Sequence, residues 1–287
     1  MPASTTGPAP LLLVDGFNVL WAGTFGFPAE VRSRDKTREL TGLFAFFALL
    51  RATIRDDLDV DPPEVVVVFD GEHGTADRVA ADQGYKANRE ATPEALKPLQ
   101  FLAPVKEGLD QHGIRWVELP DQEADDVIAT LTTRAAQTRP VRIMSRDADY
   151  YQLLTDQIRI INRSRKATRR LITTAEVIER YGVTPTQWPD FRALTGDKSD
   201  NIPGVRGVGA KVASQLLRDN IALDDLPTSG RLAGAKGKAI IASWGDVLRW
   251  RDVITMQRDL DVPLIPTGEV SPQLPKPAEV VEKLGLW

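Results

Sequence analysis

Cysteine is absent from this chain of 287 residues, and histidine occurs only twice. Without cysteine there is no disulfide framework and no thiol chemistry, a composition that fits a reducing compartment. The two histidines, His73 and His112, are isolated in the sequence, and we expect both to be structural. Zinc and copper sites, which favour sulfur and imidazole ligands, are therefore disfavoured.

Long apolar runs are also missing, since no stretch approaches the roughly 18 residues of a membrane span. Residues 1–9 lack the basic and apolar regions of a secretory signal, so we expect a flexible leader there. Positive charge is scarce: 36 lysines and arginines against 40 aspartates and glutamates give 36 − 40 = −4. This is mild evidence against a general nucleic-acid binder, although bound metal cations would cancel several carboxylates and leave a basic binding face effective.

What the chain does contain is a globular composition, with 42% hydrophobic and 26% charged residues. Five runs rich in Val, Ile and Leu are typical of strands buried on both faces, as in a parallel sheet. These runs are residues 10–15, 64–70, 114–119, 140–145 and 157–162. Helical patterns at 37–58 and 123–137 alternate with them. The order predicts an α/β domain with a twisted, mainly parallel sheet flanked by helices.

The sequence pattern changes beyond about residue 183, where turn signals and short helical patterns replace the strand-like runs. We therefore expect a small helical region to follow the α/β core, and a proline-rich tail that packs back on the core to follow that region. The predicted segments are 1–9 for the leader, 10–183 for the core, 184–262 for the helical region and 263–287 for the tail.

Nine carboxylates follow predicted strands or lie in tight turns. They are Asp15, Asp70, Glu123, Asp125, Asp126, Asp147, Asp149, Asp197 and Asp200. Any one of them alone is most simply a turn or helix-capping residue. Gathered at the carboxyl ends of parallel strands, however, they would repel one another and raise each other's pKa values. Bound divalent cations remove that cost, so the set favours a site for Mg²⁺ or Mn²⁺.

The spacing of Asp147 and Asp149 in SRDAD projects two carboxylates from one short turn, which suits one or two metal ions. Two such ions about 4 Å apart are suited to phosphodiester hydrolysis, because they activate water and stabilise the leaving oxygen. The sequence therefore favours metal-dependent phosphoryl-transfer chemistry.

Three other segments carry glycine or positive charge, and each has two interpretations. Glycines in IPGVRGVGAK (202–211) let the backbone approach a phosphate, or form a turn between two helices. Lys86 and Arg89 in GYKANRE lie on one face if that segment is helical, or belong to a solvated surface. The five basic residues in 163–170 form a phosphate-facing loop or the tip of a hairpin.

Taken in order, LLLVDG, VVVVFDG, GYKANR, EADDVIATL, SRDADYYQLL and ALTGDKSDNIPGVRGVGAK closely resemble the bacterial 5′ nuclease family. This family of 5′→3′ exonucleases and flap endonucleases includes the N-terminal nuclease domain of bacterial DNA polymerase I. The resemblance covers roughly residues 10–265, with no polymerase following. It implies a stand-alone nuclease with a helical arch around 71–105 and a helix-three-turn-helix DNA-binding region at 184–262.

The resemblance also implies roles for particular residues. One Mg²⁺ or Mn²⁺ would lie near Asp15, Asp70, Glu123 and Asp125, and the other near Asp126, Asp147, Asp149, Asp197 and Asp200. The implied catalytic residues are Lys86, Arg89, Asp125 and Asp149. K⁺ would bind the backbone of Gly204, Val205 and Val208. DNA would contact Lys86, Arg89, Arg206, Gly207, Gly209 and Lys211.

The implied activity is structure-specific 5′→3′ exonuclease and flap endonuclease cleavage by two metals, for Okazaki fragment processing and repair. The implied partners are DNA with a 5′ flap, nick or free 5′ end, an RNA primer in a hybrid, and a DNA polymerase. No membrane is expected. The protein would be a monomer in the bacterial cytoplasm, associated with the nucleoid.

Two positions depart from the family pattern, and both lose a cation. Ala22 stands where family members commonly carry an arginine, and Ala148 stands where they often carry a lysine. Arg32, Arg34 and Lys36 are candidates to supply the missing charge. The departures favour one alternative, a catalytically weakened DNA-junction binder. A second alternative, a small RNase on a similar PIN-like core, is disfavoured by the glycine segment.

Overall fold

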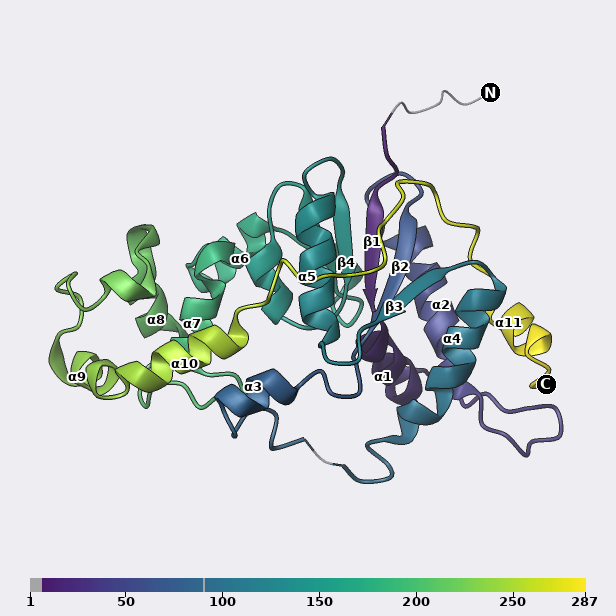
Figure 1. Ribbon diagram of the computed structural model, residues 1–287, viewed down its shortest axis with the longest axis horizontal. Coiled ribbons are helices and arrows are strands. Elements are labelled where there is room, and N and C mark those ends of the chain that lie inside the picture. Colours follow the sequence, from purple (N-terminus) through teal and green to yellow (C-terminus); the bar gives the residue numbers. More distant parts are fainter. Residues whose placement is uncertain (1–6, 90) are drawn as a thin grey trace.

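The computed structural model describes residues 7–89 and 91–287 (Figure 1). Most of the expected leader, residues 1–6, lies outside the described residues. The strands among the described residues form one six-stranded sheet in the order β3-β2-β1-β4-β5-β6. They are β1 (Leu11–Asp15), β2 (Glu64–Phe69), β3 (Arg115–Glu118), β4 (Val141–Met144), β5 (Ile158–Ile161) and β6 (Leu171–Ile172). All neighbours pair in parallel except β6, which is antiparallel to β5.

The central strands are buried on both faces, which is why their sequences are almost continuously apolar. In β1, Leu11 and Leu13 face one hydrophobic core while Leu12 and Val14 face the other. Successive side chains of a strand point to opposite faces, so one short run supplies both cores. The five strands predicted from the sequence are all present.

Helices cover both faces of this sheet (Figure 1). One face packs against α1 (Gly16–Gly26), α2 (Thr41–Asp56), α4 (Leu102–Gln111) and α11 (Pro277–Lys283). The other packs against α5 (Ala124–Ala135), and its core continues into the helical region. That region contains α7 (Trp188–Thr195), α8 (Ala210–Leu217), α9 (Gly234–Ala242) and α10 (Trp244–Ile254), and α6 (Thr174–Tyr181) directly precedes it. Between the two parts lies α3 (Ala76–Ala81), which contacts α10.

Helix α1 was not predicted, because its sequence GFNVLWAGTFG lacks a clear apolar stripe. It begins directly after β1, where the Asp15 side chain accepts a hydrogen bond from the backbone N–H of Asn18 at 3.0 Å. A side chain at Gly16 would lie 2.4 Å from the ring of Phe69, so this sharp strand-to-helix junction admits only glycine. The junction fixes the position of Asp15 at the sheet edge.

The basic segment 163–170 joins β5 to β6 as a hairpin, and three of its five basic side chains are paired within the protein. Arg163 and Arg170 both form ion pairs with Asp57, and Arg165 pairs with Glu176. Of the two interpretations of this segment, the structure favours the hairpin for these three residues, since carboxylates already occupy their guanidinium groups.

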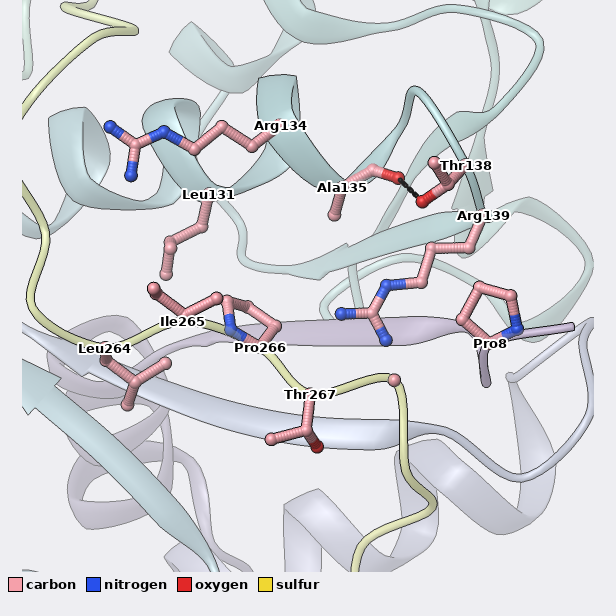
Figure 2. Close-up of a pocket in the computed structure, with 11 residues that line it drawn as sticks. Pro8, Leu131, Arg134, Ala135, Thr138, Arg139, Leu264, Ile265, Pro266 and Thr267 are labelled. Carbon is pink, nitrogen blue, oxygen red and sulfur yellow. Dashed lines mark hydrogen bonds between the residues drawn. The ribbon is translucent and has the colours of Figure 1, made fainter.

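The tail crosses the sheet at the amino ends of the strands before α11 packs against α2 (Figure 1). Ala9 donates a backbone hydrogen bond to Gly268 at 2.8 Å, which ties the segment before β1 to the tail. Figure 2 shows the open cavity of about 360 Å³ formed there by Pro8, residues of α5 and residues 264–268. The nine carboxylates lie beyond the carboxyl ends of the strands, at the other edge of the sheet.

Among the described residues, none of the helices has both the length and the apolar character that crossing a membrane requires.

Candidate metal centre

The nine predicted carboxylates lie at the carboxyl edge of the sheet. They come from the ends of β1, β2 and β4, the start of α5 and the loop after α7. Their charges influence one another: Asp70 and Asp147 raise the pKa of Asp15, while Asp125 and Asp197 raise that of Asp147. Residues far apart in sequence are thus electrostatic neighbours here.

Asp15 lies at the centre of the sheet edge and is only 9% exposed. Ser145 donates its hydroxyl to Oδ2 of Asp15 at 2.9 Å, and Tyr150 donates at 3.3 Å. Burial, followed by the charge of Asp70, nevertheless raises the pKa of Asp15 to about 7. The protein alone therefore stabilises the ionised form of this carboxylate poorly.

Asp70 follows β2 and joins this strand to α5, since the backbone N–H of Ala124 donates to its Oδ1 at 2.7 Å. Burial raises the pKa of Asp70 to about 6, against the lowering effect of that hydrogen bond. One oxygen is thus engaged in positioning the acidic turn at the start of α5.

Arg78 of α3 neutralises that acidic turn, and the sequence analysis missed it. Its guanidinium pairs with Glu123, with Asp125 at 2.9 Å and with Asp126 at 2.8 Å. The residue is 9% exposed, so all three contacts lie away from bulk solvent. Burial alone would raise the pKa of Asp125, but the charges of Arg78 and Lys86 hold it below its usual value.

Lys86 and Arg89 both reach the carboxylate cluster. Lys86 forms an ion pair with Glu123, and Arg89 with Asp200 at 3.2 Å. The segment is not helical, however: it forms turns, and Lys86 has a φ of 53°. The pair therefore shares a direction because of turn geometry, not because of helical spacing.

The turn at 84–89 is docked on the loop that carries Asp197 and Asp200. The backbone N–H of Lys86 donates to the carbonyl of Asp200 at 3.0 Å. The side chain of Asn88 donates to the carbonyl of Lys198 at 2.9 Å, and that of Asn201 to the carbonyl of Gly84 at 2.8 Å. Only part of the expected arch is helical, because turns fill the described residues between α3 and the 3₁₀ segment Lys97–Phe101.

The other end of the acidic cluster is formed by Asp149, Asp197 and Asp200, whose carboxylate oxygens lie within 4.8 Å of one another. Arg192 of α7 pairs with Asp197 but stands 3.9 Å from Asp149. Oδ1 of Asp149 is buried and has no hydrogen-bond partner among the described residues. Burial, with the charges of Asp147, Asp197 and Asp200, raises the pKa of Asp149 well above its usual value.

The carboxylates of this site lack enough hydrogen bonds and positive charge from the protein. Burial raises the pKa of Asp200 to about 6 and, with the charge of Asp125, that of Asp126 to about 7. A cluster of buried carboxylate oxygens that accepts too few hydrogen bonds has the chemistry of a site for hard divalent cations. The donor set thus fits the expected metal ions.

The glycine segment follows the loop of Asp197 and Asp200 directly. Gly204 has a φ of 66°, and a side chain there would lie 2.3 Å from the backbone nitrogen of Gly196. Gly207 and Gly209 face open space, and Gly209 precedes the first turn of α8. Arg206 and Lys211 are exposed beside them.

The carbonyl of Val205, one of the expected K⁺ ligands, accepts a hydrogen bond from the N–H of Val208 at 3.0 Å. The three candidates for the missing charge lie elsewhere. Arg32 pairs with Glu30, and within the described residues neither Arg34 nor Lys36 has a polar side-chain contact with the nine carboxylates.

Sequence reasoning missed Arg78, Arg192 and Ser145. Arg78 and Ser145 each lie within eight residues of a predicted site residue, and Arg192 precedes Asp197 by five. Proximity to the motifs was the only signal, because pairing with distant carboxylates depends on the fold.

Two family models match the chain. The 5′-3′ exonuclease N-terminal resolvase-like domain matches residues 10–182, and the 5′-3′ exonuclease C-terminal SAM fold matches residues 183–273. This chain belongs to the 5′-3′ exonuclease family. Its fold is accordingly the mixed α/β nuclease sheet flanked by helices, followed by a helical SAM-like domain.

Curated relatives agree with this membership. The thermostable DNA polymerase I of Thermus thermophilus is 42% identical over 217 residues, which are 75% of this chain and 24% of that protein. DNA polymerase I of Mycobacterium tuberculosis is 33% identical over 275 residues, or 93% of this chain and 29% of the relative. The chain therefore spans about a quarter of the length of these relatives.

Solved structures share the fold at lower identity. A T5 5′-exonuclease described with bound zinc ions has a TM-score of 0.68 and 21% identity, covering 85% of this chain and 89% of that one. Flap endonuclease-1 from Methanococcus jannaschii has a TM-score of 0.53 and 18% identity, covering 96% and 86%.

Proposed function

We propose that this chain is a divalent-metal-dependent 5′ nuclease, a structure-specific 5′→3′ exonuclease and flap endonuclease that hydrolyses phosphodiester bonds of DNA. The observation that supports this most is the under-neutralised carboxylate cluster, in which a buried oxygen of Asp149 has no described partner. In a member of the 5′-3′ exonuclease family, a cluster of this kind is best explained as a pair of metal sites.

The proposed ligands are those of the sequence analysis. Asp15, Asp70, Glu123 and Asp125 would hold one ion, and Asp126, Asp147, Asp149, Asp197 and Asp200 the other. When bound, Mg²⁺ or Mn²⁺ ions supply activation of the attacking water and neutralisation of charge that develops on the phosphate. Asp125 and Asp149 are the proposed catalytic carboxylates.

Lys86 and Arg89 are proposed to hold the scissile phosphate. Each now neutralises a carboxylate of the cluster, Glu123 and Asp200 respectively. A cation that takes over this neutralisation frees both side chains for a substrate phosphate. Arg78 is buried and engages three carboxylates, so its role would be to position the acidic turn of α5.

Residues 184–262 are proposed to be a helix-three-turn-helix DNA-binding region that follows the core at 10–183. Exposed Arg206 and Lys211, with the backbone at Gly207 and Gly209, would contact phosphates without reading the sequence. K⁺ at the carbonyls of Gly204, Val205 and Val208 would reinforce this contact. Residues 71–105 form the proposed arch, and residues 263–287 the tail on the core.

The proposed substrates are DNA with a 5′ flap, nick or free 5′ end, and RNA primers in hybrids. A role in Okazaki fragment processing and repair, a DNA polymerase partner, a monomeric state and a location at the bacterial nucleoid follow from the same proposal.

Cleavage of a labelled 5′-flap substrate tests the assignment. We expect wild-type protein to cleave near the flap junction with Mg²⁺ or Mn²⁺ and to be inactive in EDTA. Asp125→Ala and Asp149→Ala should each lose at least about 10³-fold in rate, because each removes a ligand of the reacting centre. Asp156→Asn, at an exposed carboxylate outside the cluster, is the matched control. Undiminished cleavage by both alanine variants would reject the two-metal assignment.

One observation favours a second candidate, a catalytically weakened DNA-junction binder: Ala22 and Ala148 carry no charge. This candidate predicts flap binding in EDTA and no cleavage with any divalent ion. Comparing flap DNA with single-stranded RNA in the same assay tests the PIN-like RNase alternative, which predicts preference for the RNA.

A further inference from the structure

Arg146 lies at the rim of the carboxylate cluster, between the end of β4 and Asp147. Its backbone N–H donates to Oδ1 of Asn18 at 3.1 Å, and its Nε donates to the same oxygen at 3.3 Å. The side chain is exposed, and its two terminal nitrogens make no hydrogen bond to any described residue. The Nε end of the guanidinium is therefore held by Asn18, while its two terminal nitrogens are open to a ligand.

Arg146 differs in charge balance from the other cations of the site. Arg78, Lys86, Arg89 and Arg192 each form an ion pair with at least one of the nine carboxylates. Within residues 7–89 and 91–287, Arg146 forms no ion pair. Lys198, between Asp197 and Asp200, is likewise exposed and without an ion pair, but its ammonium group has no described hydrogen bond that would anchor it.

The anchor places this charge beside Asp15. Asn18 donates its backbone N–H to Oδ1 of Asp15, the N-cap of α1, and Ser145, the neighbour of Arg146, donates to the other oxygen of Asp15. Ala22 lies one helical turn beyond Asn18 on α1, hence on the same side of that helix. Ala148 is two residues beyond Arg146. Arg146 is thus anchored to the residue one turn before Ala22 on α1, and it lies two residues before Ala148 in the chain.

We propose that Arg146 is a substrate-positioning residue that binds a phosphate of the cleaved strand next to the scissile one, and that Asn18 holds it in place. The inference rests on the proposed function, since it requires a nucleic-acid strand to cross the carboxylate cluster. In this chain Arg146, which follows β4 and is anchored to Asn18 of α1, supplies positive charge that Ala22 and Ala148 do not.

The chemistry of the side chain supports this role. A guanidinium presents a planar fork that binds two oxygens of one phosphodiester, and it cannot lose its charge at physiological pH. Fixing its Nε end in advance lowers the entropy cost of ordering a long side chain on binding. An unpaired cation at the mouth of an otherwise acidic site also reduces repulsion of the incoming phosphate backbone.

Binding of a fluorescent 5′-flap DNA, measured by anisotropy in EDTA over a series of salt concentrations, tests the proposal without cleavage. Arg146→Ala should raise Kd about tenfold and lower the slope of log Kd against log salt by about 0.7 to 0.9, the loss of one phosphate contact. Asn18→Ala keeps the backbone N–H that donates to Asp15 and should give a smaller effect in the same direction. With Mg²⁺, Arg146→Ala should raise KM more than it lowers kcat.

Lys198→Ala is the matched control, because it removes an exposed, unanchored cation from the same acidic rim. We expect its Kd to stay within about twofold of wild type. An unchanged Kd for Arg146→Ala overturns the proposal, and so do equal losses in Arg146→Ala and Lys198→Ala, which would indicate a general charge effect. Wild-type protein that fails to bind and cleave flap DNA overturns the proposed function together with this inference. Normal wild-type cleavage with normal binding by Arg146→Ala overturns the inference alone.

Discussion

Buried carboxylates at the two ends of one sheet have pKa values shifted in opposite directions. Glu64, at the amino end of β2, is 1% exposed and accepts from Arg115 at 3.1 Å, Arg139 at 2.8 Å and the backbone N–H groups of Thr267 and Gly268. Burial would raise its pKa, but these hydrogen bonds and charges hold it below the usual value. Asp15, at the carboxyl end of the neighbouring strand, has a pKa raised to about 7.

The difference separates a carboxylate compensated by the protein from one that we propose to be functional. Glu64 ties the tail to the core, and the Arg139 that it pairs with lines the cavity of Figure 2. Its charge is fully compensated by the protein. The negative charge of the cluster at the other end is compensated only in part. We therefore expect cations from solution to supply the remaining positive charge. Four experiments test this contrast.

The largest effect is expected at the compensated end. Glu64→Gln keeps the shape of the side chain but leaves Arg139, whose side chain is 5% exposed, without its counter-charge. We expect a loss of about 3–5 kcal/mol in the free energy of unfolding, measured by urea denaturation. Glu269→Gln, at an exposed position of the same tail, is the control and should change stability by less than about 0.5 kcal/mol. A loss below about 1 kcal/mol at Glu64 would contradict full compensation.

The pH dependence of stability should reveal the uncompensated end. The pKa values of Asp15 (about 7) and Asp70 (about 6) are raised above the unfolded value, so the folded state holds these protons more tightly. Their contribution to stability is therefore fully present below the usual aspartate pKa of 3.8, and it is lost as the pH rises from there through 6 and 7.

In EDTA we expect the melting temperature at pH 8 to lie on the order of 5 °C below that at pH 5. Mg²⁺ at pH 8 should remove most of this difference, because it stabilises the ionised carboxylates. A melting temperature that rises from pH 5 to pH 8 without metal would show that the cluster is compensated after all.

Removing one uncompensated charge should stabilise the metal-free protein. Asp149→Asn relieves repulsion with Asp147, Asp197 and Asp200 and should raise the free energy of unfolding in EDTA by about 1 kcal/mol. The same variant should be stabilised less by Mg²⁺ than wild type is. Thermal unfolding with and without Mg²⁺ measures both quantities, and destabilisation of this variant in EDTA would contradict the assignment.

The smallest effect is expected at Arg115, the outer partner of Glu64. Its side chain is 35% exposed, so water replaces much of what Arg115→Ala removes. We expect a loss below about 1 kcal/mol, compared with roughly 3 kcal/mol for the buried Arg139→Ala. Equal losses of unfolding free energy in the two variants would show that burial does not determine how much each ion pair contributes to stability.

The strands and the carboxylates were accessible from the sequence because both signals are local. A strand buried on two faces is apolar throughout, as β1 and β2 are, and an aspartate at its end is visible in the letters. Helix α1 escaped prediction because its apolar residues surround the helix and leave no stripe. A helix was only one of two interpretations of the segment at Lys86, and spacing alone does not reveal the positive φ of the turn that forms there.

The sequence by itself predicted which side chains would carry the chemistry: nine carboxylates for hard cations, a glycine segment and a shortage of cations near the first and fourth acidic motifs. Only the tertiary structure decided which charges are compensated. Arg78 and Arg192 meet carboxylates 45 and 5 residues away, whereas Arg146 meets none in the described chain. The physical reason is that charge compensation depends on distance and burial in space, and parallel strands bring together residues that the chain keeps far apart.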